Sequence, residues 1–141
     1  MTATFHQPIK RHGGKKYLAP WIISLMPPRC KNPNAPADDD PGWLHYVEPY
    51  FGGGAVLFAN DPDGISEVVN DIDGGLVNFY LVLREPHLFQ RFTRFVEAMP
   101  ISQAEWERAN AICGMAAFNP VNDEGRVRLA AEFFESVWRN F

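Results

Sequence analysis

The sequence has few of the features that mark secreted, metal-binding or membrane proteins. Its 2 cysteines, Cys30 and Cys113, stand far apart in the chain, so neither a disulfide scaffold nor a zinc site is predicted. No N-terminal stretch has the basic and then apolar design of a signal peptide. No run approaches the roughly 20 apolar residues that a membrane span needs. We therefore expect a soluble, cytoplasmic protein that does not contact a membrane.

The sequence also lacks the spacing of a metal site. The 4 histidines are scattered, and we interpret them as single surface or core residues. The acidic side chains of the second half are expected on solvated helix faces; these are Glu97, Glu105, Glu107, Glu132 and Glu135. No metal ligand is predicted, and no side chain is assigned a catalytic role.

What is present is enough for a folded core. The chain has 141 residues, of which 46% are hydrophobic and 13% aromatic, so it is expected to form one domain or part of one. Its net charge is -4, yet a group of cations precedes the first acidic residue, Asp38. They are Lys10, Arg11, Lys15, Lys16, Arg29 and Lys31. This basic leading segment is either a surface for phosphates or a solvated loop.

Local patterns predict alternating helices and strands in the first half. Leu18, Trp21, Ile22 and Leu25 share one face of a short helix, with Pro20 in its first turn. A buried strand is predicted at about 44–48 and a second strand at 65–71, because both are short, apolar and bounded by turn formers. Between them, a glycine turn leads into a short helix over 55–60.

The remainder is predicted to be helical. A helix follows Asp73, another begins at Pro86, and Ser102 with Glu105 forms a capping box for the next. Asp123 is the expected N-cap of the last helix. Its apolar stripe consists of Val127, Ala130, Phe134, Val137, Trp138 and Phe141. Because this stripe reaches the terminal residue without a glycine C-cap, we expect a truncated chain.

The stretch "YVEPYFGGGAVLF" places three glycines, Gly52 to Gly54, between two apolar segments. A glycine turn after a strand lets backbone amides approach a ligand, and a carboxylate about twenty residues later, here Asp71, can accept hydrogen bonds from ribose hydroxyls. Dinucleotides and S-adenosylmethionine (SAM) are both bound in this way. The dinucleotide pattern requires a third glycine where Leu57 stands, which favours SAM. A purely structural tight turn is the alternative.

Three ordered blocks resemble those of the Dam-like DNA adenine methyltransferases. They are "IKRHGGKKYLAPWI", "YVEPYFGGGAVLF" and "NDIDGGLVNFYLVL". The family's Gly-Gly-Lys is matched by Gly13, Gly14 and Lys15, its Glu-Pro-Phe and glycine turn by 48–54, and its Asp-Ile-Asn by 71–73. The resemblance covers nearly the whole chain and is strongest up to about Leu83.

The resemblance implies an α/β fold, namely an incomplete Rossmann-like SAM-dependent methyltransferase domain with C-terminal helices leading toward a target-recognition region. Within 1–141, we expect a basic segment facing cofactor and DNA at 1–31, a cofactor core at 42–85 and a helical insertion at 86–141. The implied cofactor is SAM, and the implied partner is double-stranded DNA. The implied cofactor-binding residues are Arg11, Lys15, Phe51, Gly52, Gly54 and Asp71.

Two departures from the family pattern limit what the resemblance implies. Arg11 replaces the stacking aromatic residue of the first block, although a guanidinium can also stack on a flat ring. The catalytic Asp-Pro-Pro-Tyr block does not occur in the chain. The resemblance therefore implies an adenine methyltransferase that needs a missing C-terminal half or a second polypeptide. The alternatives are a non-catalytic remnant that binds a protein or nucleic acid, and a nicotinamide-dependent oxidoreductase.

Overall fold

The computed structural model describes residues 7–11, 13–30, 42–61, 63–113, 120 and 122–138. Lys31, Asp38 and Phe141, which entered the predictions above, lie outside these ranges. The chain divides into two compact units, Met1–Asp71 and Ile72–Phe141, which are described separately. In the described part of the chain, no helix combines the length and the apolar character that a membrane crossing requires.

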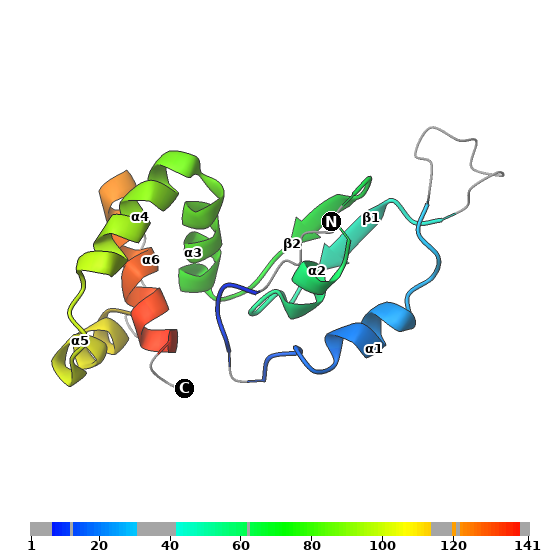
Figure 1. The fold of residues 1–141 in the computed structure, drawn as a ribbon. Coiled ribbons are helices and arrows are strands. Elements are labelled where there is room, and N and C mark those ends of the chain that lie inside the picture. Colours follow the sequence, from blue (N-terminus) through cyan, green and yellow to red (C-terminus); the bar gives the residue numbers. More distant parts are fainter. Residues whose placement is uncertain are drawn as a thin grey trace. The chain divides into compact units, whose positions relative to one another are not determined.

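The first unit is a small strand–helix–strand fold. The strands β1 (His45–Glu48) and β2 (Ser66–Val69) pair in parallel, with Val47 opposite Val68. Parallel strands need a crossover connection, and here it contains α2 (Ala55–Ala59), against which α1 (Ala19–Ser24) packs (Figure 1). This confirms a mixed α/β unit. Its sheet has two strands within the described residues, which is less than a complete Rossmann sheet.

Of the apolar stripe predicted for α1, Ile22 packs against the core and the other three residues do not. Leu18, Trp21 and Leu25 are 53%, 61% and 64% exposed. The core of the unit is formed by Ala19, Tyr46 and Val56, with Ile22, Ile23, Met26, Trp43, Leu57 and Ile65 packed against it. Ala19, Ile22, Ile23 and Met26 also have helical spacing, and the small Ala19 lies in the core with Tyr46 of β1 and Val56 of α2.

The strands are less buried than the sequence predicted. In β1, Tyr46 and Glu48 are buried while His45 and Val47 are exposed, and all four residues of β2 are exposed. The strand predicted at 44–48 is present, but only its alternate residues are buried. In β1 the reason is that successive side chains point to opposite faces of a sheet, and the core of this unit covers only one of these faces.

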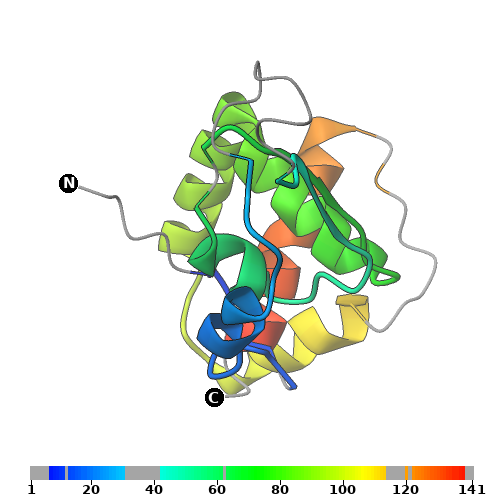
Figure 2. The ribbon, with the colours of Figure 1, turned by 90° about the vertical axis from the view of Figure 1, so that its right-hand side faces the viewer.

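The second unit is a bundle of α3 (Gly74–Arg84), α4 (Pro86–Ala98), α5 (Gln103–Cys113) and α6 (Asp123–Trp138). The last helix, α6, packs against the other three (Figures 1 and 2). Phe79 of α3 lies at the centre of the core. Its ring meets those of Phe92, Phe133 and Phe134, with centroid distances of 5.8, 5.8 and 6.3 Å. Aromatic pairs at such distances stabilise the fold by more than the burial of their surface alone would.

The central position of α6 overturns two predictions. Glu132 is fully buried and Glu135 is 8% exposed, although the sequence predicted both on a solvated face. Arg108 of α5 donates to one oxygen of the Glu132 carboxylate, Oε1, at 2.5 Å. The helix begins at Asp123, and its cap is Asn122, whose side-chain oxygen accepts a hydrogen bond from Gly125 N–H at 2.8 Å. The Ser102 half of the predicted capping box is present, since its hydroxyl accepts from Glu105 N–H at 3.2 Å.

Candidate functional site

The glycine turn after β1 is held by both conformation and packing. Gly52 and Gly54 have φ values of 56° and 73°, a region that side chains rarely adopt. A Cβ atom on Gly54 would lie 2.7 Å from atoms of both the Phe51 and Phe58 rings. A Cβ on Gly52 would meet nothing within 4 Å. Gly54 is therefore required by the protein's own packing, whereas Gly52 borders open space in which a ligand could approach the backbone.

Asp71, which follows the end of β2, faces this turn. Its Oδ2 atom accepts a hydrogen bond from Gly52 N–H at 2.8 Å. The parallel pairing continues past the two strands, because Asn70 N–H donates to Glu48 O and Phe51 N–H donates to Asn70 O, both at 3.0 Å. This ladder sets the two strand ends in register, and it brings the carboxylate to the glycine backbone as the sequence predicted.

The second aspartate of the Asp-Ile-Asp block has a different role. The Oδ1 atom of Asp73 accepts hydrogen bonds from Gly75 N–H at 3.0 Å and Leu76 N–H at 3.2 Å. It is the N-cap of α3, where it satisfies two amide groups that have no partner inside the helix. The two carboxylates are thus separated in function, with Asp71 on the glycine turn and Asp73 on a helix end.

Lys15 joins the basic leading segment to the end of β1. Its ammonium donates to Glu48 Oε1 at 2.7 Å and to the Tyr50 carbonyl at 3.2 Å. The other oxygen of Glu48 accepts from the Tyr46 hydroxyl at 2.8 Å. Burial raises the pKa of Tyr46, and the hydrogen bond to the Glu48 carboxylate raises it further. In the sequence, Glu48 was noted only as part of a motif. A carboxylate within an apolar strand is itself a signal, because a buried charge needs a partner.

A hollow of about 370 Å³ lies between the leading segment and the glycine turn. It is lined by five of the six predicted cofactor-binding residues, namely Arg11, Lys15, Phe51, Gly52 and Asp71. The sixth, Gly54, is the N-cap of α2 and is not among the residues that line the hollow. Exposed Tyr50 also borders the hollow.

The wall of the hollow formed by the leading segment is another tight turn. Gly14 N–H donates to Arg11 O at 2.9 Å, and a Cβ on Gly14 would lie 2.9 Å from that same oxygen. The hollow therefore offers backbone atoms at two glycine turns, a carboxylate, basic groups and an aromatic side chain. Such a set suits a ligand that carries hydroxyl groups, a flat ring and a formal charge. Among the described residues, no group of three His, Cys, Asp or Glu side chains could hold a metal ion.

Comparison with known families defines the class of protein. The model for D12 class N6 adenine-specific DNA methyltransferases matches residues 12–111. This match covers more than half of the chain and contains Lys15, the glycine turn and Asp71, whereas Lys10 and Arg11 precede it. The chain therefore belongs to the D12 class of N6 adenine-specific DNA methyltransferases.

Among individual proteins, the chain is similar to the Type II methyltransferase M1.LlaDCHI of Lactococcus lactis subsp. cremoris. The two are 33% identical over 73 residues, which is 52% of this chain and 20% of the relative. The chain thus spans only part of the length of the relative that it matches. No solved structure matches the chain.

Proposed function

We propose that this chain supplies the SAM site of a DNA methyltransferase that methylates the exocyclic amine of adenine. The observation that carries the proposal is the hydrogen bond between Asp71 and Gly52 N–H, in a chain that belongs to an adenine methyltransferase family. It joins the glycine turn and the acidic strand end, the two parts that a nucleoside-bearing cofactor requires.

The residues present fit this cofactor. The open space at Gly52 admits a ligand next to the backbone, and the carboxylate of Asp71 can accept further hydrogen bonds from ribose hydroxyls, since it has about four lone-pair sites. Phe51 and Arg11 would border its flat ring, and Lys15 would hold the Glu48–Tyr50 segment in place. When bound, SAM supplies an electrophilic methyl group on a sulfonium ion.

The basic leading segment is proposed to contact DNA. Lys10 and Lys16 are exposed, and neither the pairing of Lys15 nor the turn at Arg11 covers them. Exposed lysines bind phosphates with an affinity that falls as salt rises. Together with the 42–85 cofactor core and the helices of 86–141, this segment forms the N-terminal part of the proposed enzyme. Cys30 and Cys113 form no disulfide, and this and a DNA substrate are both in keeping with a cytoplasmic location.

Titration calorimetry of SAM into the 141-residue chain tests the cofactor site. Asp71→Ala should abolish measurable binding, because it removes the carboxylate that faces the turn. Asp73→Ala is the matched control: it removes a carboxylate two positions away that caps α3, and it should leave SAM affinity unchanged. Equal affinity of the wild type and Asp71→Ala, or no binding of SAM at all, would refute the proposal. NADH titrated in parallel should not bind; if NADH binds and SAM does not, the oxidoreductase alternative is correct.

The second candidate is a chain that binds without catalysing. Its basis is the lack of an Asp-Pro-Pro-Tyr block in the sequence, since that block would polarise and stack the flipped adenine. We propose that methyl transfer requires another polypeptide segment that supplies it. Transfer of tritiated methyl groups to DNA should be undetectable with this chain alone. Transfer that appears when a polypeptide carrying the block is added would favour an enzyme in two parts, and no transfer after that addition would favour the chain that binds without catalysing. Activity of the chain alone would show that its own residues suffice.

A further inference from the structure

We infer that the outward face of α4 contacts the phosphate backbone of double-stranded DNA. The identity of the partner rests on the proposed function, whereas the surface is derived from the second unit alone. This surface, called the α4 strip, consists of His87, Gln90, Arg91 and Arg94. It belongs to another unit than the hollow at Asp71 and is not part of the cofactor site.

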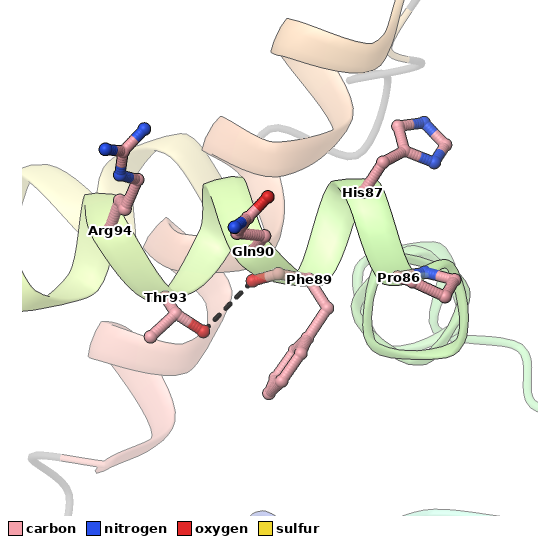
Figure 3. Close-up of a pocket in the computed structure, with 6 residues that line it drawn as sticks. All are labelled: Pro86, His87, Phe89, Gln90, Thr93 and Arg94. Carbon is pink, nitrogen blue, oxygen red and sulfur yellow. Dashed lines mark hydrogen bonds between the residues drawn. The ribbon is translucent and has the colours of Figure 1, made fainter.

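The strip follows from helix geometry. Its members are spaced by three and four residues, so they share one face of α4. Figure 3 shows His87, Gln90 and Arg94 on one side of the helix and Phe89 and Thr93 on another. These residues, with Pro86, line a shallow hollow of about 610 Å³. The opposite face is anchored, because Leu88 and Phe92 are buried.

The charges of the strip are available to a partner. Within the described part of the chain, Arg91 and Arg94 take part in none of the ion pairs, whereas Arg108 is held by Glu105 and Glu132 and Arg84 lies 3.6 Å from Glu85. The one acidic residue of α4 is Glu97, near its C-terminus. Asp123 lies 3.4 Å from His87, so the two arginines carry the unbalanced positive charge of the strip.

On the other helices of the bundle, exposed cations are fewer or stand close to acidic residues; on α6, Arg126 and Arg128 are exposed but follow an acidic first turn. The exposed residues at the start of α5 are Gln103, Ala104 and Glu107, and α6 begins with Asp123 and Glu124. Arg91 also lines a second hollow of about 410 Å³ with Arg108, Arg128 and Glu124; because Arg108 is held by Glu105 and Glu132, Arg91 and Arg128 supply the available cations there. Arginine and glutamine side chains on a helix are typical contacts to DNA phosphates, which position a protein without reading sequence.

Fluorescence anisotropy with a short labelled duplex of random sequence tests the strip. Arg94→Gln should weaken binding about tenfold, and the slope of log affinity against log salt should fall by about 0.9, or by about 1.8 for Arg91→Gln/Arg94→Gln. Arg94→Lys keeps the charge and should keep the slope. The matched control is Arg126→Gln, an exposed arginine of α6 whose carbonyl accepts from Asn78 of α3, and it should lose much less affinity.

Three outcomes would overturn the inference. They are equal losses for Arg94→Gln and Arg126→Gln, no binding of the duplex by the wild-type chain at about 50 mM salt, and equally strong competition by poly-glutamate, which would indicate an acidic protein partner. Circular dichroism checks that each variant keeps its helices. SAM titration separates the two proposals. If the wild-type chain does not bind SAM, the cofactor site is refuted. The difference in DNA affinity between Arg94→Gln and Arg126→Gln tests only the strip.

Discussion

The ammonium of Lys15 lies 2.7 Å from the Oε1 atom of Glu48, which stands 33 positions later in the chain. The Glu48 side chain is only 7% exposed, while that of Lys15 is 36% exposed. The cation therefore closes over a buried carboxylate, and in doing so it fastens the leading segment to the strand that precedes the glycine turn.

Lys15→Met should lower the free energy of unfolding by about 1–2 kcal/mol, because Glu48 would stay buried without its cation. Lys16→Met is the control, since Lys16 is the exposed neighbour and should change stability by less than about 0.5 kcal/mol. Urea denaturation of both variants gives the comparison. Equal effects of the two substitutions would show that the pair with Glu48 does not stabilise the fold. In Lys15→Met/Glu48→Gln, part of the loss should be recovered.

Gly54→Ala should destabilise the chain by about 2 kcal/mol or more, because the added methyl group would meet the Phe51 and Phe58 rings at 2.7 Å and the φ of 73° would be strained. Gly74→Ala at the start of α3 is the control: its Cβ would meet nothing within 4 Å. It should be neutral or slightly stabilising. Thermal unfolding followed by circular dichroism distinguishes them, and a stable Gly54→Ala would contradict the packing described for the turn.

Arg108→Leu should cost about 3–5 kcal/mol, because it leaves the fully buried Glu132 without its main cation. Arg128 remains, but its Nε atom is 3.8 Å from the carboxylate and its side chain is 59% exposed. The double variant Arg108→Leu/Glu132→Leu should regain most of that loss, since no buried charge is left unpaired. Chemical denaturation of the two variants measures the difference, and equal stability of the two would contradict a stabilising role for this ion pair.

Stability above neutral pH should depend on Tyr46. Because burial and Glu48 raise its pKa in the folded chain, the stability contributed by the protonated phenol is fully present below about pH 10, the value for an unfolded tyrosine, and falls as the pH rises above it. Tyr46→Phe removes this term, so its free energy of unfolding should fall less steeply than that of the wild type between about pH 10 and 11. Parallel curves for the two proteins would contradict the raised pKa.

The sequence predicted the first unit where local chemistry decides the structure. Gly52 and Gly54 needed a positive φ, and Asp71 followed a short strand, so the approach of this carboxylate to the turn could be foreseen from spacing. Its use as an acceptor for Gly52 N–H could not, because a hydrogen bond depends on the register of the two strands. The register became visible only with the ladder from Glu48 through Asn70 to Phe51.

The predictions failed where tertiary packing overrides a local pattern. Glu132 has the polarity of a surface residue, and its burial follows from the position of α6 against three other helices. Within the predicted stripe of α1, Leu18, Trp21 and Leu25 are exposed and Ile22 packs against the core, because a competing stripe that includes the small Ala19 faces the core. Asn122 and Asp123 are both good N-caps, so the choice between these neighbours could not be made from residue type.

The backbone hydrogen bonds that continue past β1 and β2 also determine which insertions and deletions would leave the hollow intact. Residues added to the connection between α2 and β2 would lengthen a surface loop and leave the strand ends facing each other. A single deletion between Ser66 and Asp71 would shift the strand by one position and turn its side chains to the opposite face. Natural length variation among related proteins should therefore concentrate before β2 and be absent within it.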